Sequence, residues 1–315
     1  MKSNAIIRIV IWSIVLVLLV GILLAFLTEE AYLNDYTVAT SPLASEAAVP
    51  TENVVSATPV KPLPNEKKLV IDGGSIDGIE IEWVAGDIIL VPKDVEEITI
   101  SESDVKDEKY AMRYHVDDRK LEISYCEERL MSGLGISLGA DIRKDLFIYV
   151  PMDWECRSLE IDAADATVEI SDMRIGELDL DGASGICRLN NCDIRDLDID
   201  TASGDVIFSG TLDTLDFDAA SANFTGDFFS TPSHIDMDSV SGKLDIRLPE
   251  DCGYALSMDG MSKTFRSDFQ GTENRNGIHT YGDGRCRIRI DGMSCEVTIR
   301  KGERVPAQEA AQPTT

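Results

Sequence analysis

Pairs of aspartates recur at regular intervals in the middle of the chain, and they are the residues most able to bind a charged ligand. Each pair encloses one apolar residue, and the four pairs are Asp179/Asp181, Asp198/Asp200, Asp216/Asp218 and Asp236/Asp238. Carboxylate oxygens are ligands that Ca²⁺ prefers, and Ca²⁺ accepts loose coordination geometry. The repeated pairs therefore predict a face that binds a cation, with Ca²⁺ as the candidate, or a basic partner. A solvated acidic face is the structural alternative.

Other residue types that support chemistry lack the required spacing. The three histidines, His115, His234 and His279, form no H-x-x-x-H pair. Seven cysteines include no C-x-x-C pair, which argues against a zinc site or a thioredoxin-like motif. No glycine-rich loop has the context of a nucleotide site. The sequence thus predicts no catalytic residues and no bound cofactor other than the possible Ca²⁺.

The aspartate pairs belong to an internal repeat of about 19 residues. Five copies begin at Leu159, Leu178, Leu197, Leu215 and Ile235, so their starts are 19, 19, 18 and 20 residues apart. Apolar and acidic residues alternate within each copy, which places them on opposite faces of a β-strand. Degenerate copies occur at residues 79–86, 256–263 and 288–295.

Three copies end in Ser-Gly, at Gly185, Gly204 and Gly242. Glycine permits positive φ, and serine can bond to nearby backbone. We expect these three glycines to occupy equivalent turns whose backbone angles disfavour branched side chains. The second aspartate of each pair could cap the same turn through its carboxylate, which is another structural alternative to ligand binding.

This pattern predicts an all-β fold, a parallel β-helix or β-solenoid with coils of about 19 residues, over residues 66–302. One coil cannot bury its apolar side alone, whereas stacked coils share a continuous core. An antiparallel sandwich would not need the near-constant period. Cys187 and Cys192 align with apolar positions and are expected in the core. Residues 112–125 predict a hairpin, and the strand at 146–150 should end at Pro151.

Stacking would place equivalent aspartates about 4.8 Å apart. Each neighbouring contact between carboxylates then costs on the order of 1–3 kcal/mol before salt screening. Residues 159–248 contain 20 acidic and 5 basic side chains, a balance of −15, so hydration, salt or a cationic partner must offset the repulsion. Enzymes that act on acidic polysaccharides from a β-helix need basic residues on the repeat face. The scarcity of these residues argues against an enzyme.

An uncharged segment at residues 9–27 predicts a transmembrane helix. Its 19 residues would span about 28 Å, close to the hydrocarbon thickness of a bilayer. Lys2 and Arg8 precede it and Glu29 follows it, so the positive-inside rule predicts a cytoplasmic N-terminus and an extracytoplasmic remainder. A cleaved signal peptide is the alternative, but its apolar region is normally shorter. Residues 1–28 are therefore predicted to anchor the protein in the cell membrane by a single pass.

Proline, alanine, serine and threonine dominate residues 29–65, which predicts a flexible linker, and residues 303–315 predict a disordered tail. The formal charge is −28, and because residues 1–27 contribute +2, the remainder carries −30. Such a charge repels nucleic acid and attracts metal cations, polyamines or basic proteins. We therefore expect no nucleic-acid and no nucleotide partner.

The repeat region resembles the bacterial family DUF4097, to which an adhesin role has been assigned by inference. The resemblance rests on the turns at Ser184-Gly185, Ser203-Gly204 and Ser241-Gly242, on Leu146–Pro151, and on residues 248–254. It implies a β-helix-like domain of envelope proteins without established catalytic residues, and some relatives are linked to envelope stress. The turn glycine is missing at Ala166, Ala222, Lys263 and Cys295.

These observations predict a membrane-anchored, extracytoplasmic, non-enzymatic interaction or scaffold protein of the bacterial cell envelope, with adhesion as one version. Its partner would be a cell-envelope protein or a cationic ligand. The alternative is a sensor or regulatory component of an envelope-stress system. Because only eight residues precede the apolar segment, that role would require a separate membrane partner.

Overall fold

The computed structural model describes residues 69–103, 105, 110–126 and 143–302. The predicted transmembrane helix at residues 9–27, the linker and the tail lie outside the described residues. Within the described ranges, no helix is both long and apolar enough to span a bilayer. The helical element there is one short 3₁₀ turn, η1 (Gly73–Ser75).

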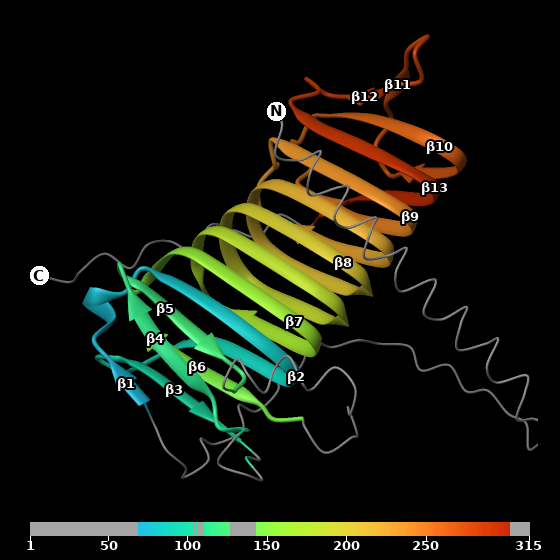
Figure 1. The fold of residues 1–315 in the computed structure, drawn as a ribbon. Helices are drawn as coiled ribbons and strands as arrows, with labels where there is room; N and C mark the ends of the chain where they lie inside the picture. The colour runs from blue at the N-terminus through green and yellow to red at the C-terminus, as the bar shows by residue number, and fades with distance from the viewer. Residues whose placement is uncertain (1–68, 104, 106–109, 127–142, 303–315) are drawn as a thin grey trace, which may run out of the picture. The chain divides into compact units, whose positions relative to one another are not determined.

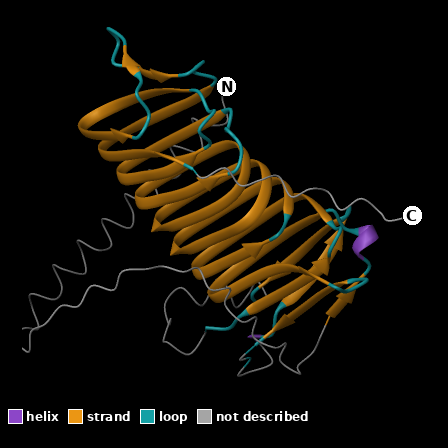
Figure 2. Cartoon of the chain, turned by 180° about the vertical axis from the view of Figure 1, so that it is seen from behind, coloured by secondary structure: helices purple, strands orange, loops and turns teal. Residues whose placement is uncertain are grey.

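Long strands wind around the molecule as a stack of coils, as Figures 1 and 2 show. Neighbouring strands in the stack are parallel and belong to one sheet. This arrangement confirms the predicted all-β solenoid. In stacking order the strands are β2 (Gly78–Lys93), β7 (Glu155–Ser171), β8 (Arg174–Phe228), β9 (His234–Leu248), β13 (Cys286–Lys301) and β10 (Tyr254–Ser267).

The copies of the sequence repeat are partners in the sheet, which confirms the repeat, including its degenerate members. Their first apolar residues lie in one row across the stack, because each copy pairs with the equivalent position of its neighbour. The pairs are Ile79 with Leu159, Leu159 with Leu178, Leu215 with Ile235, Ile235 with Ile288, and Ile288 with Leu256.

The order of the coils differs from their order in the sequence at the C-terminal end. The last strand, β13, lies between β9 and β10 and pairs in parallel with both. Strand β10 is therefore the outermost coil, although β13 follows it in the chain. A repeat pattern cannot show this exchange, because both strands carry the same apolar and acidic alternation.

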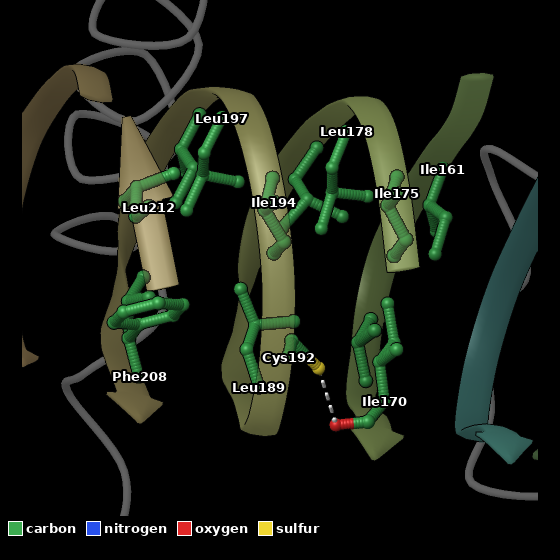
Figure 3. Close-up of a cluster of buried hydrophobic side chains, with 14 of the residues drawn as sticks. Ile161, Ile170, Ile175, Leu178, Leu189, Cys192, Ile194, Leu197, Phe208 and Leu212 are labelled. Carbon is green, nitrogen blue, oxygen red and sulfur yellow. Dashed lines mark hydrogen bonds between the residues drawn. The ribbon is translucent and has the colours of Figure 1, made fainter. Parts of the chain in front are cut away.

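Inward-facing apolar side chains fill the centre of the coils (Figure 3). Leu178, Leu189 and Ile194 are at most 1% exposed, and Cys192 is 2% exposed. The thiol of Cys192 donates to the carbonyl of Ile170 at 3.6 Å, and burial raises its pKa to about 12. A thiol that stays protonated is unreactive. Cys192 is thus a core residue, as predicted, and the half-buried Cys187 packs against the same core.

Antiparallel strands cover the N-terminal end of the stack. The two halves of β2 pair with different strands, and each of these continues into an antiparallel neighbour. The outer edge of β2 is therefore paired along both of its halves. The covering strands are β1 (Leu69–Ile71), β3 (Ile98–Glu102), β4 (Arg113–Asp117), β5 (Lys120–Ser124) and β6 (Leu146–Pro151).

The predicted hairpin is formed by β4 and β5. Its two central residues, Asp118 and Arg119, have φ values of 42° and 69°. Positive φ at both positions is the feature of a two-residue turn whose twist matches the flanking strands. The predicted strand that ends at Pro151 is β6, and it pairs with β2 and β3.

The C-terminal end is covered less completely. A short hairpin of β11 (Thr272–Glu273) and β12 (His279–Tyr281) pairs with Tyr254–Leu256 at the start of β10. Aromatic rings pack beneath it: the His279 ring lies 4.8 Å from Phe265 and 5.9 Å from Tyr254. The hairpin closes one side of the last coil.

Candidate functional site: an acidic face along the coils

The predicted aspartate pairs form two columns that run across the stack, and we call the two columns together the acidic face. Register partners include Asp179 with Glu160 and Asp216 with Asp236 in the first column. The alternation of the strands directs these side chains away from the core. The first column is Glu80, Glu160, Asp179, Asp198, Asp216 and Asp236, and the second is Glu82, Asp162, Asp181, Asp200, Asp218 and Asp238.

The structure brings all eight predicted aspartates onto this face and extends it at its N-terminal end. Glu80, Glu82, Glu160 and Asp162 belong to it because their copies of the repeat stack on the others. The sequence interpretation left them out, although the pattern I-E-I-E at residues 79–82 and L-E-I-D at 159–162 carries the same alternation. Accepting glutamate in place of aspartate would have found them.

Basic side chains partly neutralise both ends of the acidic face. Lys120 forms ion pairs with Glu80 and, at 3.0 Å, with Glu160. At the other end, Arg289 Nε lies 2.9 Å from Asp236 Oδ1, and Arg289 Nη2 lies 3.5 Å from Asp238 Oδ2. Asp236 and Asp238 are therefore each paired with a basic side chain. Repulsion is concentrated between these two ends.

Four aspartates between the two ends, Asp179, Asp181, Asp198 and Asp200, have raised pKa values. Partial burial, reinforced by the charges of Asp179 and Asp200, raises the pKa of Asp181 to about 7. Partial burial and the charges of Asp216 and Asp179 raise the pKa of Asp198 to about 7 as well. The same causes raise the pKa of Asp179, and burial raises that of Asp200. At neutral pH, protons therefore neutralise part of this stretch.

The side chains of Asp162 and Asp181 come from neighbouring coils and lie next to each other in the second column. Burial and the charges of Glu160 and Glu80 raise the pKa of Asp162, and the contact with Asp181 opposes this rise.

The turn-capping alternative applies at Asp259, which lies in the second column beyond Asp291. Its Oδ1 accepts from the backbone N–H of Gly260 at 2.9 Å. Capping is thus observed at a position at the end of the stack.

The acidic face does not converge on a single point. In the part of the chain that the structure describes, no group of three or more histidine, cysteine, aspartate or glutamate side chains is arranged to hold one metal ion. The three histidines lie on β4, β9 and β12. His234 Nε2 is 3.7 Å from Asp236 Oδ2, at the neutralised end of the face. Within the described residues the acidic face therefore consists of columns of carboxylates and not of a closed metal cage.

The turn glycines stand in register beside the acidic face, with one difference among them. Gly185 and Gly204 have φ values of 150° and 151°, and a Cβ on Gly204 would lie 2.4 Å from the carbonyl oxygen of Gly185. Gly242 is outside the positive-φ region. Its register partners, Ala222 and Cys295, carry buried side chains, whereas a Cβ on Gly242 itself would lie 2.4 Å from Met237 Cε, the end of a flexible side chain. The expectation of one shared turn therefore holds only for Gly185 and Gly204.

A buried lysine near the N-terminal end is a feature that the sequence interpretation missed. The Lys144 side chain is 3% exposed, and its Nζ donates to Glu102 Oε2 at 2.5 Å and to the carbonyls of Tyr110 and Tyr125 at 2.7 and 2.5 Å. The ring centroid of Trp83 lies 4.7 Å away. Burial lowers the pKa of Lys144, and the ion pair with Glu102 opposes this. With three acceptors for its three protons, Lys144 is a structural anchor and not an accessible nucleophile.

A groove of about 730 Å³ crosses the coils along another side of the stack. Its walls include Arg157, Arg174 and Arg195 above a floor of buried apolar residues. Four carboxylates, those of Asp77, Glu155, Asp193 and Asp213, line it as well. Arg157 pairs with Asp77 and Arg174 with Glu155, each at 3.3 Å. With four carboxylates against three arginines, the groove is not a basic site for anions.

Comparison with known proteins places this architecture in a family. No curated protein matches the chain. Solved structures of low similarity include a provisionally named cell adhesion protein from Clostridium sporogenes, with 11% identity, a TM-score of 0.30, and coverage of 75% of this chain and 98% of the other. A provisionally named adhesin from Bacteroides fragilis has 12% identity, a TM-score of 0.39, and coverage of 75% and 99%.

A provisionally named lipid binding protein from Parabacteroides distasonis has 11% identity, a TM-score of 0.29, and coverage of 73% of this chain and 95% of the other. The sequence profile of one family matches residues 76–300, which contain every coil of the stack. The chain therefore belongs to the Toastrack DUF4097 family.

Proposed function

We propose that this protein is a membrane-anchored, extracytoplasmic and non-enzymatic interaction protein whose acidic face binds a cationic ligand. The observation that carries the proposal is the stretch of the face between Lys120 and Arg289. There partial burial, reinforced by the charges of neighbouring carboxylates, raises the pKa values of Asp179, Asp181 and Asp198. A bound cation would relieve the repulsion between these carboxylates, and the ligand would lie along the columns.

The ligand class follows from charge and spacing. Carboxylates of one column are about 4.8 Å apart, and the two columns are separated by two residues, about 6.6 Å. A divalent ion, a polyamine or a basic segment of another envelope protein can bridge neighbouring carboxylates on such a lattice. The uncharged segment at residues 9–27 supports the anchored, extracytoplasmic part of the proposal.

Thermal unfolding of residues 66–302 with Ca²⁺, with spermine, or with chelator alone at matched ionic strength tests the proposal. A cation that binds the folded state raises the melting temperature. We expect this increment in the wild type and its loss in a central variant. The central variant is Asp179→Asn, Asp181→Asn, Asp198→Asn and Asp200→Asn.

A control variant makes the same number of Asp→Asn substitutions but away from the two columns. It should keep the increment of the wild type. Equal and small responses in all three proteins would mean that the acidic face is only solvated, and would overturn the proposal. The control variant is Asp193→Asn, Asp205→Asn, Asp213→Asn and Asp227→Asn.

Competition with protons gives the same experiment a second readout. Because Asp181 and Asp198 have pKa values of about 7, a cation must displace protons below that pH. The cation-induced increment should therefore be larger at pH 8 than at pH 6. An increment independent of pH would place the bound cation elsewhere.

A further inference from the structure

The outer edge of β10 is open over most of its length. Strand β12 pairs with residues 254–256, and beyond Leu256 no strand of the described residues pairs with this edge. Figure 1 shows β10 as the outermost coil, with the β11–β12 hairpin beyond it. An unpaired strand edge presents a row of backbone donors and acceptors to another chain. Solenoids normally close their last coil for this reason.

Exposed apolar side chains gather at the corner of the same coils. The position that follows the second acidic column by two residues is alanine in the middle of the stack, as at Ala183 and Ala202. In the three coils at the C-terminal end of the stack, the same position is Val240, Met293 and Met261, whose exposed fractions are 39%, 57% and 86%. Their neighbours pair in register, so the three side chains follow one another along the corner. Methionine adapts to irregular apolar partners.

The charge at this end permits a second copy of a strongly acidic protein to approach. Residues 249–302 contain eight acidic and eight basic side chains, a balance of 0, against −15 for residues 159–248. In the two outer coils, Arg289 and Ser257 occupy the first acidic column. Two copies would therefore meet where their mutual repulsion is smallest.

From these three observations we propose that two copies of the chain associate tail to tail through the open edge of β10 and the corner formed by Val240, Met293 and Met261. A two-fold axis through the corner at Met261 would set the residues before the corner in one copy against the residues after it in the other. The strands would then pair in antiparallel fashion. Lys263 Nζ already donates a hydrogen bond to the carbonyl of Met258 at 2.9 Å. Strand pairing between the two copies is therefore limited to part of the edge.

The association closes at two copies. At the opposite end of the stack, β1, β3 and the β4–β5 hairpin cover the outer coil, so a head-to-tail contact has no equivalent open coil to join. An interface that uses the same patch on both chains gives a symmetric dimer and leaves no site for a third. This inference is independent of any ligand of the acidic face.

Site-directed cross-linking of the full-length protein in membranes tests the proposal. Met261→Cys places a thiol at the two-fold axis, and Ala183→Cys places one at the equivalent turn position of a middle coil. A short bis-maleimide should link Met261→Cys into a dimer and leave Ala183→Cys and the wild type as monomers. The wild type controls for the native cysteines, six of which are buried and one half-buried.

Adding Met293→Asp to Met261→Cys should weaken the association about tenfold and lower the cross-linked fraction accordingly. Adding Ala183→Asp, the matched change in a middle coil, should leave it unchanged. Met293 is exposed, so this variant folds without loss of a core residue. Equal cross-linking of Met261→Cys and Ala183→Cys would indicate random collision, and an absence of dimer in both would show that the edge stays open. Either result would overturn the proposal.

Discussion

Single residues set how closely the coils approach one another. Gly204 lies beside the backbone of the preceding coil, and an added Cβ would be 2.4 Å from the carbonyl oxygen of Gly185. The neighbouring atom belongs to the backbone, so it cannot move aside as a side chain can. Lys144 and Glu102 have a comparable role at the end of the stack, where one buried ion pair joins β3 to the segment before β6.

We expect Gly204→Val to destabilise the domain by about 1–3 kcal/mol, because its φ of 151° disfavours L side chains and the added atoms clash with backbone. Urea unfolding of residues 66–302 measures the change. Ala222→Gly is the control, since Ala222 occupies the register position of Gly242. It should cost less than about 1 kcal/mol. Equal costs for the two substitutions would mean that the positive-φ turn at Gly204 carries no strain.

At the scale of the elements, one strand holds the C-terminal end together. Strand β13 pairs along its whole length with β9 on one side and with β10 on the other. Apart from β13, the strand that pairs with β10 among the described residues is β12, and that pairing covers three residues. The last segment of the fold therefore completes coils that were translated before it.

Truncation after Gly284, which removes β13, should free β10 and expose one edge of β9. Stability in a solenoid is the sum of coils and their nearest-neighbour interfaces, so the loss should stay local. Hydrogen exchange should become fast at residues 254–267 and faster at 235–246, whereas β2 and β7 remain protected. Undiminished protection of β9 would show that β10 had moved into the place of β13, since both strands carry the same repeat pattern.

At the scale of the whole molecule, the excess of negative charge links stability to pH. Asp181 and Asp198 have pKa values of about 7 in the fold, above the ordinary value of 3.8. The folded state therefore binds more protons than the unfolded chain between about pH 4 and pH 7, and stability increases as the pH falls through this range. Asp77 acts in the opposite direction, because its hydrogen bond to Arg119 lowers its pKa.

The urea midpoint of residues 66–302 should accordingly be higher at pH 5 than at pH 8, and should fall again in stronger acid, where the stability that Asp77 contributes is lost. Asp181→Asn combined with Asp198→Asn should flatten the profile between pH 5 and pH 8 by raising the midpoint at pH 8. A midpoint that rises steadily from pH 5 to pH 8 in the wild type would contradict the raised pKa values.

Local patterns in the sequence were sufficient for the coils and for the acidic face. Alternation with a period of two fixes which side chains point inward, and the repeat of about 19 residues fixes the register, because a slip of one residue would turn the apolar row outward. The aspartates at 179, 198 and 216 could therefore be assigned to one face before any contact was known. The β4–β5 hairpin was equally local, since four residues determine its turn.

Tertiary structure alone decided which coil stacks on which and which charges meet. The repeat copies in β10 and β13 offer similar interfaces to β9, so their order depends on the fit of whole coils and not on any motif. That choice brings Arg289 to Asp236, residues that are 53 positions apart. The contact of Lys144 with Glu102 and Trp83 arises in the same way. Coulomb interactions and burial depend on distances in space, and the sequence carries those distances only where the repeat itself imposes them.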